Sequence, residues 1–187
     1  MNKIIIVAIV VVLAVAGFVI VKSNSNDNKN AIEDISRSTN TTDNTDKTKT
    51  ACELLTLEDA KSLIGQSATL AEGSGGSNLA TTESVKVDNC TYSSDGATLG
   101  DLKQITIQIH SSEVSQIKQS YESYKKEFPG EALAGLGDSA YYATEAKQVG
   151  VLKGGHWLLV FGGSINAGDE ANKQLDIETA QIAIDKL

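Results

Sequence analysis

The sequence is poor in histidine, cysteine and positive charge, and each shortage excludes a class of function. The chain has 16 Lys and Arg residues against 24 Asp and Glu residues, which gives a formal net charge of −8 at pH 7. Binding of nucleic acid requires a basic surface, so this balance excludes nucleic acid as a partner. It also disfavours close docking of the polar part of the chain on anionic lipid.

The two histidines, His110 and His156, lie far apart in the sequence. Neither has the closely spaced acidic partners that would complete a metal-ligand motif. The sequence therefore predicts no metal site and no cofactor. His156 follows Lys153-Gly154-Gly155, a pattern that predicts a turn with a solvent-exposed imidazole ring.

One long apolar run stands at the start of the chain. Residues 4–21 are eighteen residues without a charged or polar side chain, and Lys3 and Lys22 flank them. As a helix they would extend about 27 Å, which is close to the hydrocarbon thickness of a bilayer. Residues 1–22 are therefore predicted to form a single transmembrane anchor.

Two other interpretations of this run are open. A cleaved signal peptide has a shorter apolar region that ends in a small-x-small site, which Ala14-Val15-Ala16 could provide. The bulky apolar residues 18–21 follow that site and favour an uncleaved anchor. A buried core helix is the other alternative, but such a helix seldom begins at residue 4 and leads into a Ser/Asn-rich segment. No cysteine lies near the end of the run, which excludes a lipid-modified cysteine.

The next segment, residues 23–50, is polar and contains only three apolar residues, Ala31, Ile32 and Ile35. Burial of so little apolar surface does not offset the entropy lost when a chain becomes ordered. We therefore expect a disordered polar stalk between the anchor and the rest of the chain.

The orientation of the anchor depends on two conflicting signals. Lys22 and Lys29 outnumber Lys3, and the positive-inside rule then favours a cytoplasmic C-terminus. Cys52 and Cys90 are too widely spaced for a C-x-x-C motif and most simply form one disulfide, a bond typical of extracytoplasmic domains. We give the cysteines more weight and place the domain outside the cell membrane. Two buried free thiols are the alternative.

Residues 51–187 have the length of one domain with its own core. Helical periodicity of apolar residues predicts three helices, at residues 56–65, 112–128 and 169–187. Strand-like patterns occur five times, at residues 85–92, 102–109, 139–144, 148–152 and 157–161. We expect an α+β domain, in which an antiparallel sheet of about five strands is covered by two to three helices and preceded by a single transmembrane helix.

Local details refine this expectation. Thr56 and Asp59 predict a capping box at the start of the first helix, and the pattern in residues 85–92 predicts a bulge near Asn89. Trp157 is expected in the core. The apolar faces of the three helices predict these buried residues: Leu57, Ala60, Leu63, Ile64, Val114, Ile117, Tyr121, Tyr124, Phe128, Ile177, Ala180, Ile184 and Leu187.

Two short motifs are weak signals of chemistry. Gly137-Asp138-Ser139-Ala140 resembles the start of a serine-hydrolase block, which also needs a histidine oriented by a carboxylate. His156 is the only later histidine, and Lys153 stands where that carboxylate would be expected. Gly135, Gly137 and Ala140 fit G-x-G-x-x-[GA], but a strand rather than the required helix is expected after them. No catalytic residue is predicted.

Four segments together resemble a known group of proteins. They are Cys52-x-Leu54-Leu55-Thr56-x-x-Asp59-Ala60-x-x-Leu63-Ile64-Gly65, Asn89-Cys90-Thr91-Tyr92, Gly135-Leu136-Gly137-Asp138-x-Ala140-Tyr141, and Trp157-Leu158-Leu159-Val160 with the helix after it. The chain resembles uncharacterised actinobacterial cell-envelope lipoproteins and is more distantly similar to the extracellular sensor domains of mycobacterial serine/threonine kinases. The resemblance implies a disulfide-linked α+β domain outside a Gram-positive-type membrane and implies no catalytic residues. The chain departs from that group because it lacks the lipid-acceptor cysteine.

These observations predict a membrane-anchored extracytoplasmic domain that binds a small-molecule ligand or a partner protein and is not an enzyme. One alternative is a structural or assembly component of a cell-surface complex, such as a pilin-like protein or an accessory subunit. A pilin would carry a Glu inside its apolar helix, and residues 4–21 contain none. A hydrolase is the third hypothesis.

Overall fold

The computed structural model describes residues 49–75 and 85–187. The predicted anchor, residues 1–22, and all but the end of the predicted stalk, residues 23–50, lie outside the described residues. Among the residues that are described, no helix is long and apolar enough to cross a membrane.

The domain is built on a seven-stranded antiparallel sheet with the strand order β1-β2-β3-β7-β6-β5-β4. Two long central strands, β3 and β7, pair along seven residues, from Gln104 opposite Gly163 to His110 opposite Trp157. The strands are β1 (Thr69–Leu70), β2 (Lys86–Ser94), β3 (Lys103–Ser111), β4 (Gly130–Ala132), β5 (Ser139–Ala143), β6 (Gln148–Lys153) and β7 (His156–Gly163).

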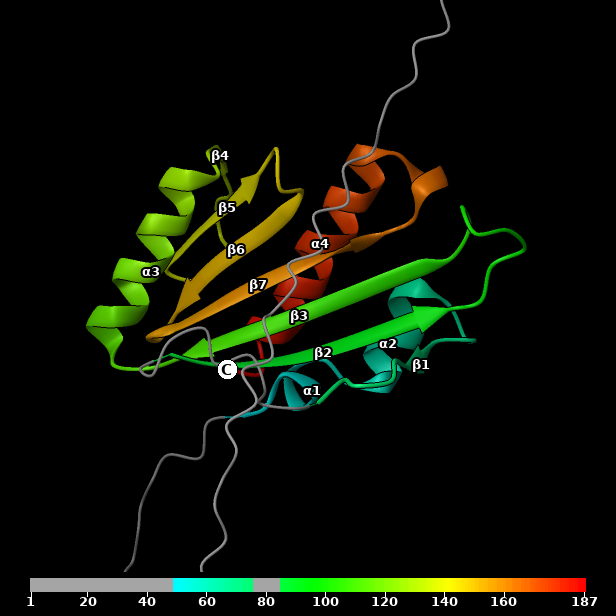
Figure 1. Cartoon of the computed structure of the whole chain (residues 1–187), viewed down its shortest axis with the longest axis horizontal. Coiled ribbons are helices and arrows are strands. Elements are labelled where there is room, and N and C mark those ends of the chain that lie inside the picture. Colours follow the sequence, from blue (N-terminus) through cyan, green and yellow to red (C-terminus); the bar gives the residue numbers. More distant parts are fainter. Residues whose placement is uncertain (1–48, 76–84) are drawn as a thin grey trace, which may run out of the picture. The chain divides into compact units, whose positions relative to one another are not determined.

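Helices cover the two faces of the sheet unequally. One face carries α1 (Ala51–Leu54), α2 (Leu57–Ile64) and α4 (Asp169–Ile184), and among the described helices α3 (Val114–Glu127) alone lies on the other face. Figure 1 shows α3 at the β5–β6 side of the sheet and α1 and α2 beside β2. A short 3-10 helix, η1 (Ile165–Ala167), precedes α4. The α+β class predicted from the sequence is therefore confirmed.

Alternation along the strands produces two separate cores. The core under α1, α2 and α4 includes these fully buried residues: Leu54, Leu55, Ile105, Ile107, Val149, Val151, Leu158 and Val160. The core under α3 is smaller and richer in aromatic side chains: Ile117, Tyr121, Tyr141, Ala143, Leu152, Trp157 and Leu159. The expected burial of Tyr121 and Trp157 is confirmed.

The five predicted strands and three predicted helices are present, with ends that differ by a few residues. The prediction of about five strands missed β1 and β4, which contain two and three residues, all of them exposed, so that they show no apolar alternation. The prediction of two to three helices missed α1, which has four residues. The predicted bulge near Asn89 is wrong, because β2 pairs with β3 without interruption from Lys86 to Ser94.

The predictions for helix ends and for buried helix faces are confirmed only in part. The capping box of Thr56 and Asp59 is confirmed. Three residues expected in the core are instead exposed, namely Leu57, Val114 and Leu187. In α4 the buried side also includes polar residues that the apolar pattern could not reveal: Asp176 and Thr179.

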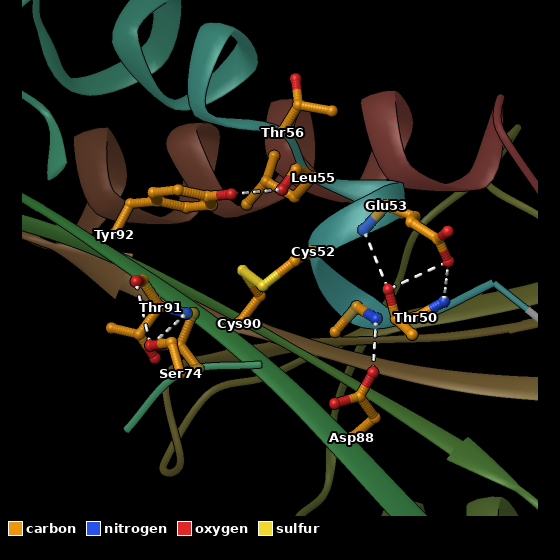
Figure 2. Close-up of a disulfide and its surroundings, with 12 residues drawn as sticks. Thr50, Cys52, Glu53, Leu55, Thr56, Ser74, Asp88, Cys90, Thr91 and Tyr92 are labelled. Atoms are coloured by element: carbon orange, nitrogen blue, oxygen red, sulfur yellow. Dashed lines mark hydrogen bonds between the residues drawn. A yellow bond between two sulfur atoms is a disulfide. The ribbon is translucent and has the colours of Figure 1, made fainter. Parts of the chain in front are cut away.

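Residues 51–55 lie against β2 and are attached to it at three consecutive inward-facing positions (Figure 2). The Asp88 carboxylate accepts a hydrogen bond of 2.8 Å from the Ala51 N–H, and the Tyr92 hydroxyl donates one of 2.9 Å to the Leu55 carbonyl. Between them, Cys90 forms the disulfide with Cys52, and no free cysteine remains. The predicted disulfide is confirmed, and we call residues 51–55 the N-terminal clamp.

The outer edge of β2 is also covered. The Ala71 and Gly75 N–H groups donate to the Thr91 and Asn89 carbonyls at 2.9 and 2.8 Å, and the Ser74 hydroxyl bonds the backbone of Thr91. These bonds satisfy backbone groups that an open edge strand would leave available for pairing with another chain.

Burial shifts the pKa of one carboxyl group and one imidazole ring strongly toward the neutral form. Asp176 in α4 is 1% exposed, and burial raises the pKa of its carboxyl to about 8. Its Oδ1 has no hydrogen-bond partner within the described residues. On the opposite face, burial lowers the pKa of His110 to about 4.

We predict that replacement of Cys52 by Ser lowers the stability of the protein strongly. The cysteines are 38 residues apart, and the chain-entropy model assigns about 4 kcal/mol to closing a loop of this length. The melting temperature should then fall by more than ~10 °C, since 1 kcal/mol corresponds to roughly 3–5 °C at this size. Ser74→Ala is the matched control, because it loses hydrogen bonds to β2 but no cross-link. An unchanged melting temperature in Cys52→Ser would contradict this account.

We predict that stability falls between pH 6.5 and pH 8 because of Asp176. Its folded-state pKa lies above the unfolded value, so the folded state binds more protons in this range and loses stability as pH rises. The loss should be roughly 2 kcal/mol over these 1.5 pH units, at about 1.4 kcal/mol per unit. Below pH 6.5 the opposite effect of His110, which is destabilising as it becomes protonated, offsets this slope.

Urea denaturation of the full-length chain at pH 6.5 and pH 8 measures this effect. Asp176→Asn cannot ionise and should be equally stable at both pH values. Parallel losses in the natural protein and in Asp176→Asn would show that Asp176 does not cause the change.

Candidate functional site

The residues that resemble a hydrolase block do not form a catalytic arrangement. Ser139 begins β5, and its hydroxyl shares a hydrogen bond of 2.9 Å with the Tyr121 hydroxyl. Asp138 accepts a hydrogen bond of 2.9 Å from the Gly154 N–H, which ties the loop before β5 to the β6–β7 turn. His156 is partly buried, contrary to the prediction, and its Nδ1 has no partner among the described residues. No carboxylate therefore orients His156 through this nitrogen.

The glycine motif and the histidines also have structural explanations. Gly135 and Gly137 lie between β4 and β5 with φ values of 79° and 62°, and the strand that follows them offers no helix N-terminus for phosphate. His110 stacks on Trp157 with ring centroids 4.1 Å apart. Within residues 49–75 and 85–187, no group of three or more His, Cys, Asp or Glu side chains is placed to hold a metal ion.

A cavity of about 560 Å³ opens where β2 begins and β3 ends. Lys49 and Lys86 line it, and each lies within two residues of a part of the chain that is not described. Its described polar groups are partly engaged, because Asp88 bonds to Ala51 and the Ser112 hydroxyl donates to Gln116. The described residues do not define the whole wall of this cavity, so no site is assigned to it.

At the opposite end of the sheet, two loops from distant parts of the sequence are joined by Asn166. They are the β2–β3 loop, residues 95–102, and the β7–α4 connection, residues 164–168 (Figure 1). The Asn166 N–H donates to the Gly100 carbonyl at 3.1 Å, and its Nδ2 donates to Asp101 Oδ1 at 2.8 Å. We call residues 95–102 and 164–168 the distal tip.

Each loop of the distal tip is also fixed internally. The Thr98 hydroxyl donates to Asp101 Oδ2 at 2.7 Å, and the hydrogen bonds from Asn166 and Thr98 lower the pKa of the Asp101 carboxyl. In the other loop, Asn172 forms two hydrogen bonds of 3.0 Å with the backbone of Ser164. These bonds give the tip a defined conformation although it lacks a core of its own.

Gly100 allows the two loops to approach closely. A Cβ at this position would lie 2.6 Å from Oδ1 of Asn166, which is well inside van der Waals contact. Any larger residue would push the Asn166 side chain out of its hydrogen bond with Asp101. The close contact between Gly100 and Asn166 therefore depends on the absence of a side chain at residue 100.

The rigid tip presents two large aliphatic side chains to solvent. Leu99 is 82% exposed and Ile165 is 84% exposed. Both line one cavity of about 300 Å³, together with Leu102, Lys103, Ser93 and others. The ammonium group of Lys103 has no hydrogen-bond or ion-pair partner in the described part of the chain. Paired aliphatic side chains held in water on fixed loops are typical of a surface that another molecule covers.

The first described residue and the C-terminus meet at the other end of the domain. The Lys49 ammonium group donates to the Lys186 carbonyl, and the Lys153 ammonium group donates to the Ile184 carbonyl at 2.6 Å. α4 begins beside the distal tip at Asp169 and ends at Ile184, a length of about 24 Å for a helix of 16 residues. The tip thus points away from the end at which the chain enters the domain.

Sequence reasoning missed the distal tip because the signal is small. Leu99 and Ile165 are each a single large aliphatic residue among small and polar neighbours, in Gly-Ala-Thr-Leu-Gly-Asp and Gly-Ser-Ile-Asn-Ala-Gly. Such isolated residues have no periodicity, so pattern analysis assigns them to loops. The pairing of β3 with β7 and the contacts of Asn166 bring them together.

We predict that Asn166→Ala releases the two loops of the distal tip without unfolding the domain. The lost hydrogen bond should lower stability by only about 1 kcal/mol. Amide hydrogen exchange should become at least ~tenfold faster at Asp101 and in residues 164–167 and remain unchanged in β3 and β7. Gln174→Ala is the matched control, because it removes a surface amide bonded to Glu178 outside the tip. Unchanged exchange in the tip of Asn166→Ala would contradict the role given to this residue.

Comparisons with protein-family models, with curated proteins and with solved structures found no match to this chain. The resemblance to envelope lipoproteins therefore stays a prediction that depends on four short segments. The distal tip has to be interpreted from its own residues.

Proposed function

We propose that this chain is a membrane-anchored extracytoplasmic protein whose domain binds a partner protein through the distal tip and catalyses no reaction. The observation that carries the proposal is the exposure of Leu99 and Ile165 on two loops that hydrogen bonds hold together. Burial of both side chains by a partner would remove their apolar surface from water at little entropic cost, because the loops are already ordered.

The location outside the membrane is supported by the apolar run at residues 4–21 and by the disulfide between Cys52 and Cys90. Disulfides persist in oxidising compartments and are rare in the cytosol. The distance between the tip and the chain entry at Lys49 suits a tethered domain, because a partner can reach the tip without approaching the tether.

A partner protein fits the tip better than a lipid surface does. Asp95 and Asp101 belong to the same loop as Leu99, and the chain as a whole carries a net charge of −8. Anionic headgroups would repel these carboxylates. Lys103, which has no partner among the described residues, offers a single cation that an acidic group beside an apolar pocket could meet.

The absence of catalysis is supported by the bonding of the one candidate nucleophile. The Ser139 hydroxyl is bonded to Tyr121 and is not activated by a base, and His156 lacks an orienting carboxylate at Nδ1.

We predict that a photoreactive amino acid in place of Leu99 or Ile165 cross-links the same partner protein in intact cells. The matched control is Val114, an aliphatic residue that is 52% exposed at the start of α3, near the β6–β7 turn and away from the tip. The Val114 position should give no cross-link to that partner. The purified partner should then bind the Leu99→Ser, Ile165→Ser double variant at least ~tenfold more weakly, as expected for the loss of about 1.4 kcal/mol or more. Equal cross-linking from all three positions, or unchanged affinity, would contradict the proposal.

A further inference from the structure

A second surface lies on the face of the sheet that carries α3. This helix packs over Tyr141, Leu152, Trp157 and Leu159 and covers the side of the face formed by β5, β6 and the start of β7. Beyond it, β2, β3 and the end of β7 continue without a helix above them in the described part of the chain (Figure 1). We call this region the open face. Val87, Thr91 and Thr106 on this side are buried. Its side chains that are at least partly exposed are Asn89, Ser93, Gln104, Gln108, His110, Gln148 and Phe161.

The outward positions of β2, β3 and β7 on the open face carry no charged side chain. On this side β2 and β3 present Asn, Thr, Ser, Gln and His residues, and β7 presents Trp, Leu and Phe residues. The chain has 16 basic and 24 acidic residues, and none of them lies at an outward position of these three strands. The one titratable ring, His110, is neutral because burial lowers its pKa to about 4.

A cavity of about 290 Å³ lies on the open face, where the start of β3 and the end of β7 meet the β5–β6 turn. Phe161, which is partly exposed, lies in its wall with Gln104, Thr106 and Gln148. Lys147 also lines the cavity, but its ammonium nitrogen forms an ion pair with Oδ1 of Asp169 at 2.6 Å. The cavity therefore combines an accessible aromatic ring with neutral amide and hydroxyl groups.

The hydrogen-bonding capacity of these groups is only partly used. The Tyr124 hydroxyl donates to Gln148 Oε1, which fixes the amide and leaves its NH₂ group as a donor. The hydroxyls of Thr106 and Thr91 share a hydrogen bond of 3.0 Å. The side-chain amide of Gln104 has no partner among the described residues. The open face therefore offers both donors and acceptors at fixed positions around the Phe161 ring.

The geometry points to a neutral saccharide as the ligand of the open face, with a sugar ring stacked on Phe161 and its hydroxyls hydrogen-bonded to Gln104 and Gln148. Sugar hydroxyls both donate and accept, as carboxamide groups do, and the axial C–H groups of a β-linked gluco-configured ring form a flat apolar face that suits an aromatic ring. Neither interaction requires charge. This inference does not depend on the distal tip, because Leu99 and Ile165 do not line this cavity.

Other classes of ligand fit the open face less well. A polyanion would lack cations, because the only ammonium group in the cavity wall is paired with Asp169. A peptide that adds a strand needs a free sheet edge, and β2, β3 and β7 are paired with other segments here.

The test is a titration of the full-length chain with cellotetraose, followed by ¹H–¹⁵N NMR in a detergent without a sugar headgroup. We expect shift changes confined to the neighbourhood of Gln104, Thr106, Gln148 and Phe161. Phe161→Ala should weaken binding by roughly tenfold or more, and Phe161→Tyr should retain it. Gln104→Ala, a change at an exposed residue, should weaken binding several-fold without affecting the fold.

Phe128→Ala is the matched control, because this partly buried aromatic residue packs against Tyr124 under α3 and away from the open face. It should leave cellotetraose binding unchanged. Tetragalacturonate, a charged oligosaccharide, should not bind at the same concentrations. Absence of any cellotetraose binding at millimolar concentration, equal binding by Phe161→Ala, or preference for the charged oligosaccharide would overturn the inference.

Discussion

Strand β2 and the N-terminal clamp form the attachment on which the rest of the domain depends. Asp88, Cys90 and Tyr92 alternate with the outward residues of β2 and each hold one part of residues 51–55 (Figure 2). The clamp in turn places Leu54 and Leu55, both fully buried, over the inner face of the sheet. The clamp thus covers the inner face of β2, while β1 and the residues after it cover the outer edge of the same strand.

The main elements could be predicted from the sequence because their signals are periodic. Ile105, Ile107 and Ile109 alternate in β3 and are buried as expected. The edge strands β1 and β4 could not be predicted, since both are short and exposed and show no apolar alternation. Asp176 was missed for a different reason: a polar residue within an apolar stripe looks solvent-facing until the neighbouring elements surround it.

The candidate surfaces were less predictable than the fold. The outward side of β3 carries Gln104, Thr106, Gln108 and His110, but the lack of charge across the neighbouring strands β2 and β7 is visible only once the register is known. The distal tip needs contacts between residues about 65 positions apart in sequence, such as Asn166 with Asp101. Two such surfaces on one small domain would suit the proposed role of binding a partner, since a second ligand could bind at the same time.

The central claim is that the domain lies outside the membrane and presents its distal tip to solvent. Ile165→Cys adds one thiol at an 84% exposed position, while the two natural cysteines are joined in a disulfide and stay unreactive. Intact cells that express this variant should be treated with a membrane-impermeant maleimide, with the natural protein as the control. The account predicts equal labelling before and after lysis and no labelling of the natural protein. Labelling that appears only after lysis would contradict it.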